Sequence, residues 1–283
     1  FRGRRAATPA EAAAASEITF CCVGNDDDVR AVILADGGVL DAGRAGGIIV
    51  DHTTASAAIA REIYQRALAK ELGFLDAPLS GGQAGAEKGQ LTIMVGGDPD
   101  VYERARPVME SYAKACTLIG GAGSGQLAKM VNQICIAGVL QGLSEALHFA
   151  KRAELDIAAV IGAISKGAAQ SWQMENRWKT MVDDEFEFGF AVEWMRKDLA
   201  ICLAEADRIG ALLPVMPLYF THSSLVLPLA TGAFLAAAAR HRTTARRAAP
   251  CAPTAHPASA SRRPSPVSAP SRPPRAARRA FGR

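Results

Sequence analysis

The sequence lacks the motifs of disulfide-rich, metal-binding and membrane-spanning proteins. Its six cysteines form no C-x-x-C pair and have no regular spacing with the five histidines, so we predict no disulfide framework, no metal site and reduced thiols in the cytoplasm. No apolar run near the start is long enough for a signal peptide. The uncharged segment 209–239 is interrupted by three prolines, at positions 214, 217 and 228, so we expect no membrane partner.

Acidic residues are absent from the last 44 residues, which carry eleven arginines. The first 239 residues hold 21 basic and 28 acidic side chains, a net charge of −7. The pI of 8.8 therefore comes from the tail, and we expect no nucleic-acid partner for the folded body. Eight prolines between Pro250 and Pro274 predict a disordered segment. Such a tail is either a basic arm for nucleic acid or acidic membrane, or a stretch never selected for folding; the second interpretation is favoured.

Short apolar runs alternate with helical patterns over residues 8–121. Thr8 followed by Pro9 predicts the start of a helix. We expect buried strands at 18–23, 47–51, 73–76, 91–95 and 115–119, with helices at about 26–35, 55–71 and 99–112. This alternation predicts an α/β domain with a largely parallel sheet. After Gly125 only helices are expected, at about 125–152, 156–166, 170–182 and 190–209, and these predict an all-helical second domain.

One candidate binding segment runs from Asp76 to Ala86. A predicted strand ends in Asp-Ala-Pro, and a Ser80-Gly81-Gly82 turn follows at its carboxyl end, where α/β sheets bind ligands. Two adjacent glycines allow backbone N–H groups to approach an anion closely, and with the Ser80 hydroxyl they could hold a carboxylate. Taken alone, the segment could equally be an ordinary tight turn.

A second candidate segment runs from Gly120 to Gln133. It contains glycines but no G-K-[ST], so a nucleotide P-loop is not predicted. The spacing places Lys129, Asn132 and Gln133 on one face of a helix, and Gly125, one turn earlier, is expected to leave space above the ammonium. A lysine with two amide side chains could donate and accept protons. The alternative is a solvated polar stripe.

Together the two segments resemble the β-hydroxyacid dehydrogenase family, which includes 3-hydroxyisobutyrate dehydrogenases, tartronate semialdehyde reductases and glyoxylate/succinic semialdehyde reductases. The family pattern D-x-P-x-S-G-G-x-x-G-A is matched at 76–86, and G-x-x-x-K-x-x-N at 125–132. Residues 50–54 resemble the family's V-D-x-S-T turn, and Gly189-Phe190 and Lys197-Asp198-Leu199 resemble its G-F and K-D-L elements. The matches occur in the family's order over about residues 8–215.

The resemblance implies a reaction and a role for each matched residue. It implies an oxidoreductase that uses NAD or NADP and acts on a small 3-hydroxy acid or the matching semialdehyde, a small carboxylate, with Lys129 as general acid and base. Ser80, Gly81 and Gly82 would hold the substrate carboxylate, and Asn132 and Gln133 would bind its oxygen groups. The implied cofactor-binding residues are Val23, Gly24, Asn25, Thr54, Phe190, Lys197 and Asp198.

The resemblance also implies a fold, and the sequence departs from it at both ends. The expected architecture is a Rossmann-like α/β domain at 1–121 that lacks its first βαβ unit, then an all-α domain at 122–215 that begins with a long interdomain helix, and a non-family tail at 216–283. The family's G-x-G-x-x-G turn is absent, so the choice between NAD and NADP is not predicted.

The sequence alone is also compatible with other functions. A 6-phosphogluconate dehydrogenase-like enzyme would carry G-G-N where residues 51–54 stand, and K-x-x-H-N where Asn132-Gln133 stands. The chain could also be an inactive fragment, or a non-catalytic interaction protein with a basic tail. For an intact family member the resemblance implies a homo-oligomer.

Overall fold

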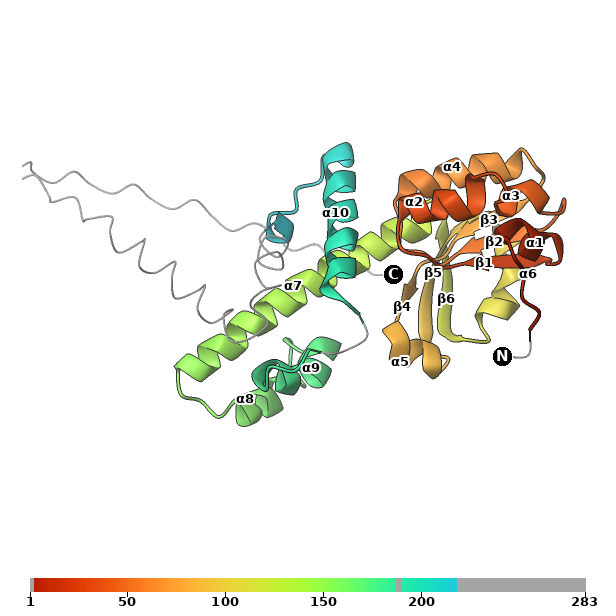
Figure 1. Cartoon of the computed structure of the whole chain (residues 1–283). Helices are drawn as coiled ribbons and strands as arrows, with labels where there is room; N and C mark the ends of the chain where they lie inside the picture. Colours follow the sequence, from red (N-terminus) through yellow and green to blue (C-terminus); the bar gives the residue numbers. More distant parts are fainter. Residues whose placement is uncertain (1–2, 187–189, 218–283) are drawn as a thin grey trace, which may run out of the picture. The chain divides into compact units, whose positions relative to one another are not determined.

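The computed structural model describes residues 3–186 and 190–217 of the chain (Figure 1). The first part of the chain forms a sheet in the order β1-β2-β3-β5-β4, with β6 beside β5. Its strands are β1 (Ile18–Cys21), β2 (Ile48–Asp51), β3 (Gly73–Asp76), β4 (Leu79–Ser80), β5 (Leu91–Gly97) and β6 (Ala113–Gly120). Each of the five predicted strands is present; the two-residue β4 was not predicted.

The sheet is mixed rather than largely parallel. β1, β2 and β3 are parallel, as are β5 and β6, but β5 is antiparallel to both β3 and β4. The change of direction follows from the turn at Gly81 and Gly82, whose φ angles of 132° and 59° favour glycine. Short helix α5 (Gly82–Glu87) continues from this turn and leads the chain back as β5. A parallel strand pair needs a long crossover connection, and the short segment with α5 between β4 and β5 does not provide one.

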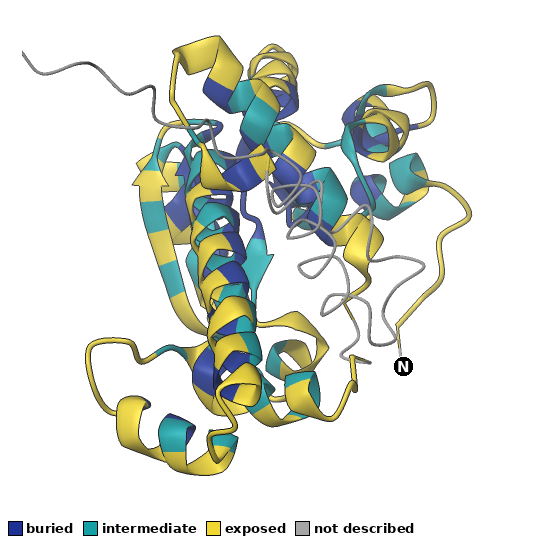
Figure 2. Cartoon of the chain, turned by 90° about the vertical axis from the view of Figure 1, so that its left-hand side faces the viewer, coloured by how far each residue is buried: buried dark blue, intermediate teal, exposed yellow. Residues whose placement is uncertain are grey.

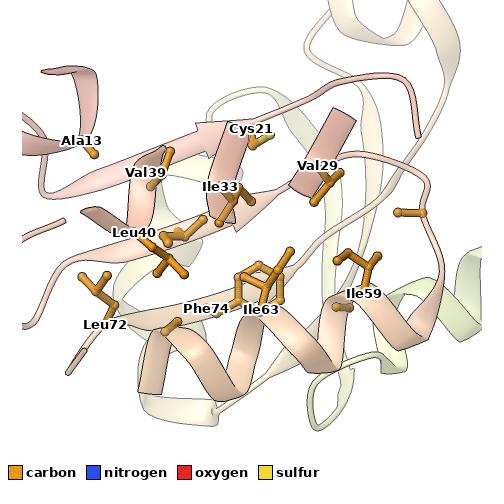
Figure 3. Packing of buried hydrophobic residues seen from close by; sticks show 14 residues of the cluster. Ala13, Cys21, Val29, Ile33, Val39, Leu40, Ile59, Ile63, Leu72 and Phe74 are labelled. Carbon is orange, nitrogen blue, oxygen red and sulfur yellow. The ribbon is translucent and has the colours of Figure 1, made fainter. Parts of the chain in front are cut away.

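Helices cover both faces of the sheet. Thr8 caps α1 (Pro9–Ala14) through a 3.1 Å hydrogen bond from the Glu11 N–H, which confirms the predicted helix start. α2 (Asp26–Val29) runs into a π-helical turn at Arg30–Leu34, and α3 (Val39–Ala42) and α4 (Ala57–Leu68) follow. Ile59 and Ile63 of α4 pack on Phe74 of the sheet (Figure 3). On the other face, α6 (Pro99–Met109) packs its own buried residues on β2, β3 and β5.

After β6 the described chain is helical, as predicted. Its helices are α7 (Ser124–Arg152), α8 (Ile157–Ile164), α9 (Trp172–Val182) and α10 (Val192–Ile209), each within two residues of the predicted bounds. Leu143 and Leu147 of α7 pack with Ile161 and Met174, and Ala137 packs with Leu199 of α10. Figure 2 shows the bands of buried and exposed residues along these helices.

Two predictions fall mostly outside the described residues. The tail predicted at 216–283 is described only at positions 216 and 217, and the uncharged segment 209–239 only up to position 217. Among the described helices, none is both long and apolar enough to cross a membrane.

Candidate active site

A fully buried carboxylate joins the sheet to the start of the long helix α7. Asp76 ends β3 and has no exposed surface; its two oxygens accept the backbone N–H groups of Gly123 at 2.7 Å and Gln126 at 2.9 Å. A negative charge at a helix N-terminus is favoured by the free N–H groups and by the helix dipole. The sequence places Asp76 at a strand end but does not show that it caps a helix 47 residues later. Asp76 thereby fixes the position of the first turn of α7.

Gly125 permits the close approach of α7 to the sheet. A Cβ atom at this position would lie nearest to the Asp76 carbonyl oxygen, at 2.5 Å from the Met94 carbonyl oxygen and at 2.9 Å from an Asp76 carboxylate oxygen. These distances are shorter than van der Waals contact, and two of the three atoms are backbone. The expectation that Gly125 leaves space above the Lys129 ammonium is therefore wrong: the missing side chain admits the neighbouring strands.

Lys129 lies one turn further along α7 and is 8% exposed. Its Nζ donates a 2.7 Å hydrogen bond to the carbonyl oxygen of Leu79, the residue before Ser80. Burial lowers the pKa of Lys129, an effect that the charge of Asp198 opposes and that of Lys197 reinforces. The two segments singled out in the sequence, 76–86 and 120–133, thus meet at this ammonium.

The turn beside Lys129 presents exposed backbone. Ser80 is half-buried and pairs with Thr92 of β5, whereas Gly81 and Gly82 are exposed. A Cβ at Gly82 would have no atom within 4 Å. Gly81 and Gly82 thus present exposed backbone two and three residues after Leu79, whose carbonyl oxygen accepts the hydrogen bond from Lys129.

Helix α10 brings a second lysine to the ends of β1 and β2. The Lys197 Nζ donates to the carbonyl oxygens of Gly24, at 3.0 Å, and of Thr54, and forms an ion pair with Asp198 Oδ1 at 3.1 Å. Burial raises the pKa of Asp198, while Lys197 acts to lower it. Lys197 thus links the loops after β1 and β2 to the helical part of the chain.

Two amide side chains extend this network along α7. Gln133, 3% exposed, donates through Nε2 to Asp198 Oδ2 at 2.7 Å, and its Oε1 accepts a 2.8 Å hydrogen bond from Asn132. Both polar ends of Gln133 are therefore engaged within the protein. Among the described residues no hydrogen bond to the side-chain oxygen of Asn132 is found, so this oxygen could accept one from a ligand.

The remaining predicted cofactor residues lie at the edge of this network. The Val23 N–H donates to Thr53 Oγ1 at 2.9 Å, which ties the loop after β1 to the loop after β2. The Asn25 side chain accepts from the N–H groups of Asp27 and Asp28 and so caps α2. Phe190 is 51% exposed just before α10, and the described interactions do not connect it with the other site residues.

The described ranges hold neither a clustered set of metal ligands nor a disulfide bond. Residues 3–186 and 190–217 contain no group of three His, Cys, Asp or Glu side chains placed to hold a metal ion. The five cysteines within these ranges are free.

Comparison with known proteins identifies the family. Residues 2–120 match the model described as the NAD binding domain of 6-phosphogluconate dehydrogenase, and residues 123–224 match the model described as NAD-binding of NADP-dependent 3-hydroxyisobutyrate dehydrogenase. An uncharacterized oxidoreductase of Shewanella frigidimarina is 57% identical over 218 residues, which cover 77% of this chain and 75% of the relative. The chain belongs to the β-hydroxyacid dehydrogenase family.

Other relatives of this β-hydroxyacid dehydrogenase have named activities. The 2-hydroxy-3-oxopropionate reductase of Escherichia coli is 38% identical over 202 residues, or 71% of this chain and 68% of the relative. The structure of Mycobacterium tuberculosis 3-hydroxyisobutyrate dehydrogenase with L-serine is similar with a TM-score of 0.71 and 28% identity, covering 78% of this chain and 77% of that one. The chain is thus an NAD(P)-dependent hydroxyacid dehydrogenase with a Rossmann-like domain followed by a helical domain.

The described residues of this dehydrogenase fit the nicotinamide end of the cofactor. The carbonyl oxygens of Gly24 and Thr54 lie at the carboxyl ends of β1 and β2, where open α/β sheets bind nucleotides. Gly24 has no side chain, and a Cβ there would lie 2.5 Å from an Asp28 carboxylate oxygen, which accepts a hydrogen bond from the Gly24 N–H, and 3.2 Å from the Trp194 ring. Polar backbone beside an aromatic ring suits a flat carboxamide-bearing ring.

The same loops do not fit the cofactor's pyrophosphate. Within the part of the chain that the structure describes, the helix that follows β1 begins with Asp26, Asp27 and Asp28 instead of a glycine-rich turn. Three carboxylates at a helix N-terminus repel a phosphate group. The acidic start of α2 is therefore unfavourable for the pyrophosphate, and the fit of these loops is limited to the nicotinamide end of the cofactor.

Asp51 makes the stability of the dehydrogenase pH-dependent. It ends β2 beside Asp76, is 1% exposed, and burial raises its pKa to about 6 despite the hydrogen bond from the Thr53 N–H. The pKa of Asp51 in the folded state exceeds that of an unfolded aspartate, so protonated Asp51 contributes to the free energy of unfolding. This contribution is fully present below about pH 4 and is lost as the pH rises through about 6. The total loss is about 3 kcal/mol.

The Asp51→Asn variant should abolish this contribution. Urea unfolding at pH 4 and at pH 7 should show that the free energy of unfolding of the variant rises by about 2.5 kcal/mol relative to that of the parent protein between the two conditions. The asparagine oxygen can still accept the Thr53 N–H, so the fold is preserved. If the free energies of unfolding of variant and parent differed by the same amount at both pH values, the expected titration of Asp51 would be contradicted.

Proposed function

We propose that this chain transfers a hydride between NAD or NADP and the alcohol carbon of a small 3-hydroxy acid, giving the matching semialdehyde, with Lys129 as the proton acceptor and donor. The observation that carries the proposal is the 2.7 Å hydrogen bond from the Lys129 Nζ to the Leu79 carbonyl oxygen. It places a buried ammonium beside the accessible turn at Ser80–Gly82. A small molecule held by this turn has its other end within reach of Lys129.

Lys129 would move the proton that accompanies hydride transfer. In the oxidation direction its neutral amine takes the proton of the substrate hydroxyl, and in reduction its ammonium returns a proton to the carbonyl oxygen. The bound nicotinamide supplies the acceptor or donor of the hydride. Burial favours this role because it lowers the pKa of Lys129 toward the pH at which both forms are populated.

Ser80, Gly81 and Gly82 would hold the substrate carboxylate. The Ser80 hydroxyl and the exposed N–H groups of the two glycines can donate to a carboxylate, and hydrogen bonds to a charged group are stronger than neutral ones. Fixing one end of the substrate directs its alcohol carbon to Lys129 and to the nicotinamide. The free oxygen of Asn132 would contribute to holding the substrate's polar groups.

Thr54, Lys197 and Asp198 would organise the cofactor side of the site. Lys197 fixes the loops of Gly24 and Thr54 through their carbonyl oxygens, and Asp198 balances its charge. Gln133 joins Asp198 to α7, so we assign it a supporting contact rather than a substrate ligand.

A substrate comparison tests the proposal. Purified chain should oxidise small 3-hydroxy acids with NAD or NADP. For the corresponding neutral amides kcat/KM should be lower by about 100-fold, because each of the three hydrogen bonds from Ser80, Gly81 and Gly82 loses about 1 kcal/mol when its acceptor is uncharged. Ser80→Ala should reduce the ratio of kcat/KM for the acid to kcat/KM for the amide. Equal values of kcat/KM for acid and amide would contradict carboxylate binding at this turn. Turnover of 6-phosphogluconate in place of the small acids would favour a 6-phosphogluconate dehydrogenase-like enzyme.

A further inference from the structure

Gln126, a buried residue to which the sequence assigns no role, makes three hydrogen bonds at the junction of β2, β3 and α7. It lies on the first turn of α7 and is 1% exposed. Its side-chain Nε2 donates to the Thr53 carbonyl oxygen at 2.7 Å, and its Oε1 accepts the Ala55 N–H at 3.0 Å. Its own N–H donates to Asp76 at 2.9 Å. A buried amide whose donor and acceptor are both used is costly to replace.

The two side-chain bonds enclose Thr54. They hold the peptide group on each side of this residue, and the Thr54 carbonyl oxygen accepts from Lys197 on α10. The backbone at Thr54 is therefore fixed to α7 by one side chain and to α10 by another. Lys129 lies three residues after Gln126 on the same rigid helix. The distance between Thr54 and Lys129 thus depends directly on Gln126.

We infer that Gln126 is a positioning residue that sets the loop at Thr54 against Lys129, so that the nicotinamide would face the alcohol carbon of the substrate while the amine faces the hydroxyl group on that carbon. This inference rests on the proposed function. Gln126 touches neither reactant; it acts through Thr54. Because a displacement of about 1 Å in reacting groups can cost on the order of 100-fold in rate, its loss affects hydride transfer more than substrate binding.

The test compares Gln126→Met with Gln141→Met. Methionine has a similar length but cannot bond to either backbone group. Gln141 lies on the same helix, is 8% exposed and bonds only to Glu145 in the described interactions, which makes it a matched control. We expect Gln126→Met to lower kcat about 10- to 100-fold with little change in KM, and to raise the primary deuterium isotope effect on kcat. Gln141→Met should leave all three quantities unchanged.

Two further measurements separate positioning from a merely structural role. Hydrogen exchange of the Ala55 amide should accelerate in Gln126→Met and not in Gln141→Met, a readout that needs no turnover. In Gln126→Glu a protonated carboxyl can donate to the Thr53 carbonyl oxygen and an ionised one cannot. The ratio of its kcat to that of the parent should therefore recover as the pH is lowered.

The outcomes distinguish this inference from the proposed function. If the parent protein oxidises no 3-hydroxy acid, the proposed function fails. If the parent is active while Gln126→Met keeps kcat and the isotope effect, only the positioning role fails. Unchanged exchange at Ala55 in Gln126→Met also overturns it, because the loop would then not depend on this side chain.

Discussion

Replacement of Lys129 with methionine should lower kcat for 3-hydroxy acid oxidation by about 10²- to 10⁴-fold, the range lost when a general acid–base group is removed. Methionine preserves the apolar stem of a side chain that is 8% exposed, so the packing around α7 is retained. The hydrogen bond to the Leu79 carbonyl oxygen and the transferable proton are lost. Steady-state kinetics at several substrate concentrations would separate the effect on kcat from that on KM.

The pH profile gives the same prediction a second check. In the parent protein the oxidation rate should rise with pH as Lys129 loses its proton, at a pH below that of an ordinary lysine because burial lowers its pKa. Lys129→Met should lack this limb of the profile. The exposed Lys151 near the other end of α7 provides a control, and Lys151→Met should keep both the rate and the pH profile. A Lys129→Met protein that retained the parent rate would remove the basis of the proposed mechanism.

Gly125→Ala should lower the free energy of unfolding by about 3 kcal/mol or more, at the upper end of the cost of overpacking. The added methyl group would meet the carbonyl oxygens of Asp76 and Met94 and a carboxylate oxygen of Asp76. Because two of these atoms belong to the backbone of the sheet, relief requires α7 to move away from the strands. That movement would weaken the hydrogen bonds from Gly123 and Gln126 to Asp76 as well.

Gly138→Ala on the same helix is the matched control for Gly125→Ala. Gly138 is exposed, and a Cβ there would meet nothing within 4 Å. Alanine should therefore stabilise this site by roughly 0.5–1 kcal/mol through helix propensity. Denaturant unfolding should show a lower free energy of unfolding for Gly125→Ala and a higher one for Gly138→Ala. Equal effects would mean that α7 does not pack closely against the sheet at Gly125.

The regular elements were predictable because their signals are local. Apolar runs of strand length alternate with helical periodicity, and Thr8-Pro9 is a recognisable helix start. The short β4 and α5 were not predicted, because two residues of strand and six of helix carry too little pattern. The mixed direction of the sheet depends on backbone angles at Gly81 and Gly82, which the sequence permits but does not require.

The site was predictable in its residue types but not in its long-range contacts. The resemblance gave Lys129 and Ser80, whereas the roles of Asp76 and Gln126 arise from bonds that join positions 47 to 73 residues apart. A single sequence shows that these residues are polar and lie near a strand end or helix start. It does not show which backbone groups they bind, because that depends on how α7 packs against the sheet.

The 29-residue helix α7 also limits how the length of this protein can vary in evolution. Gln126, Lys129 and Gln133 serve different partners from successive turns of one continuous helix. Inserting or deleting one residue between Gln126 and Lys129 would rotate everything beyond it by about 100° and turn the amine away from Leu79. Length changes should therefore be confined to the connections between helices, such as 153–156 and 165–171.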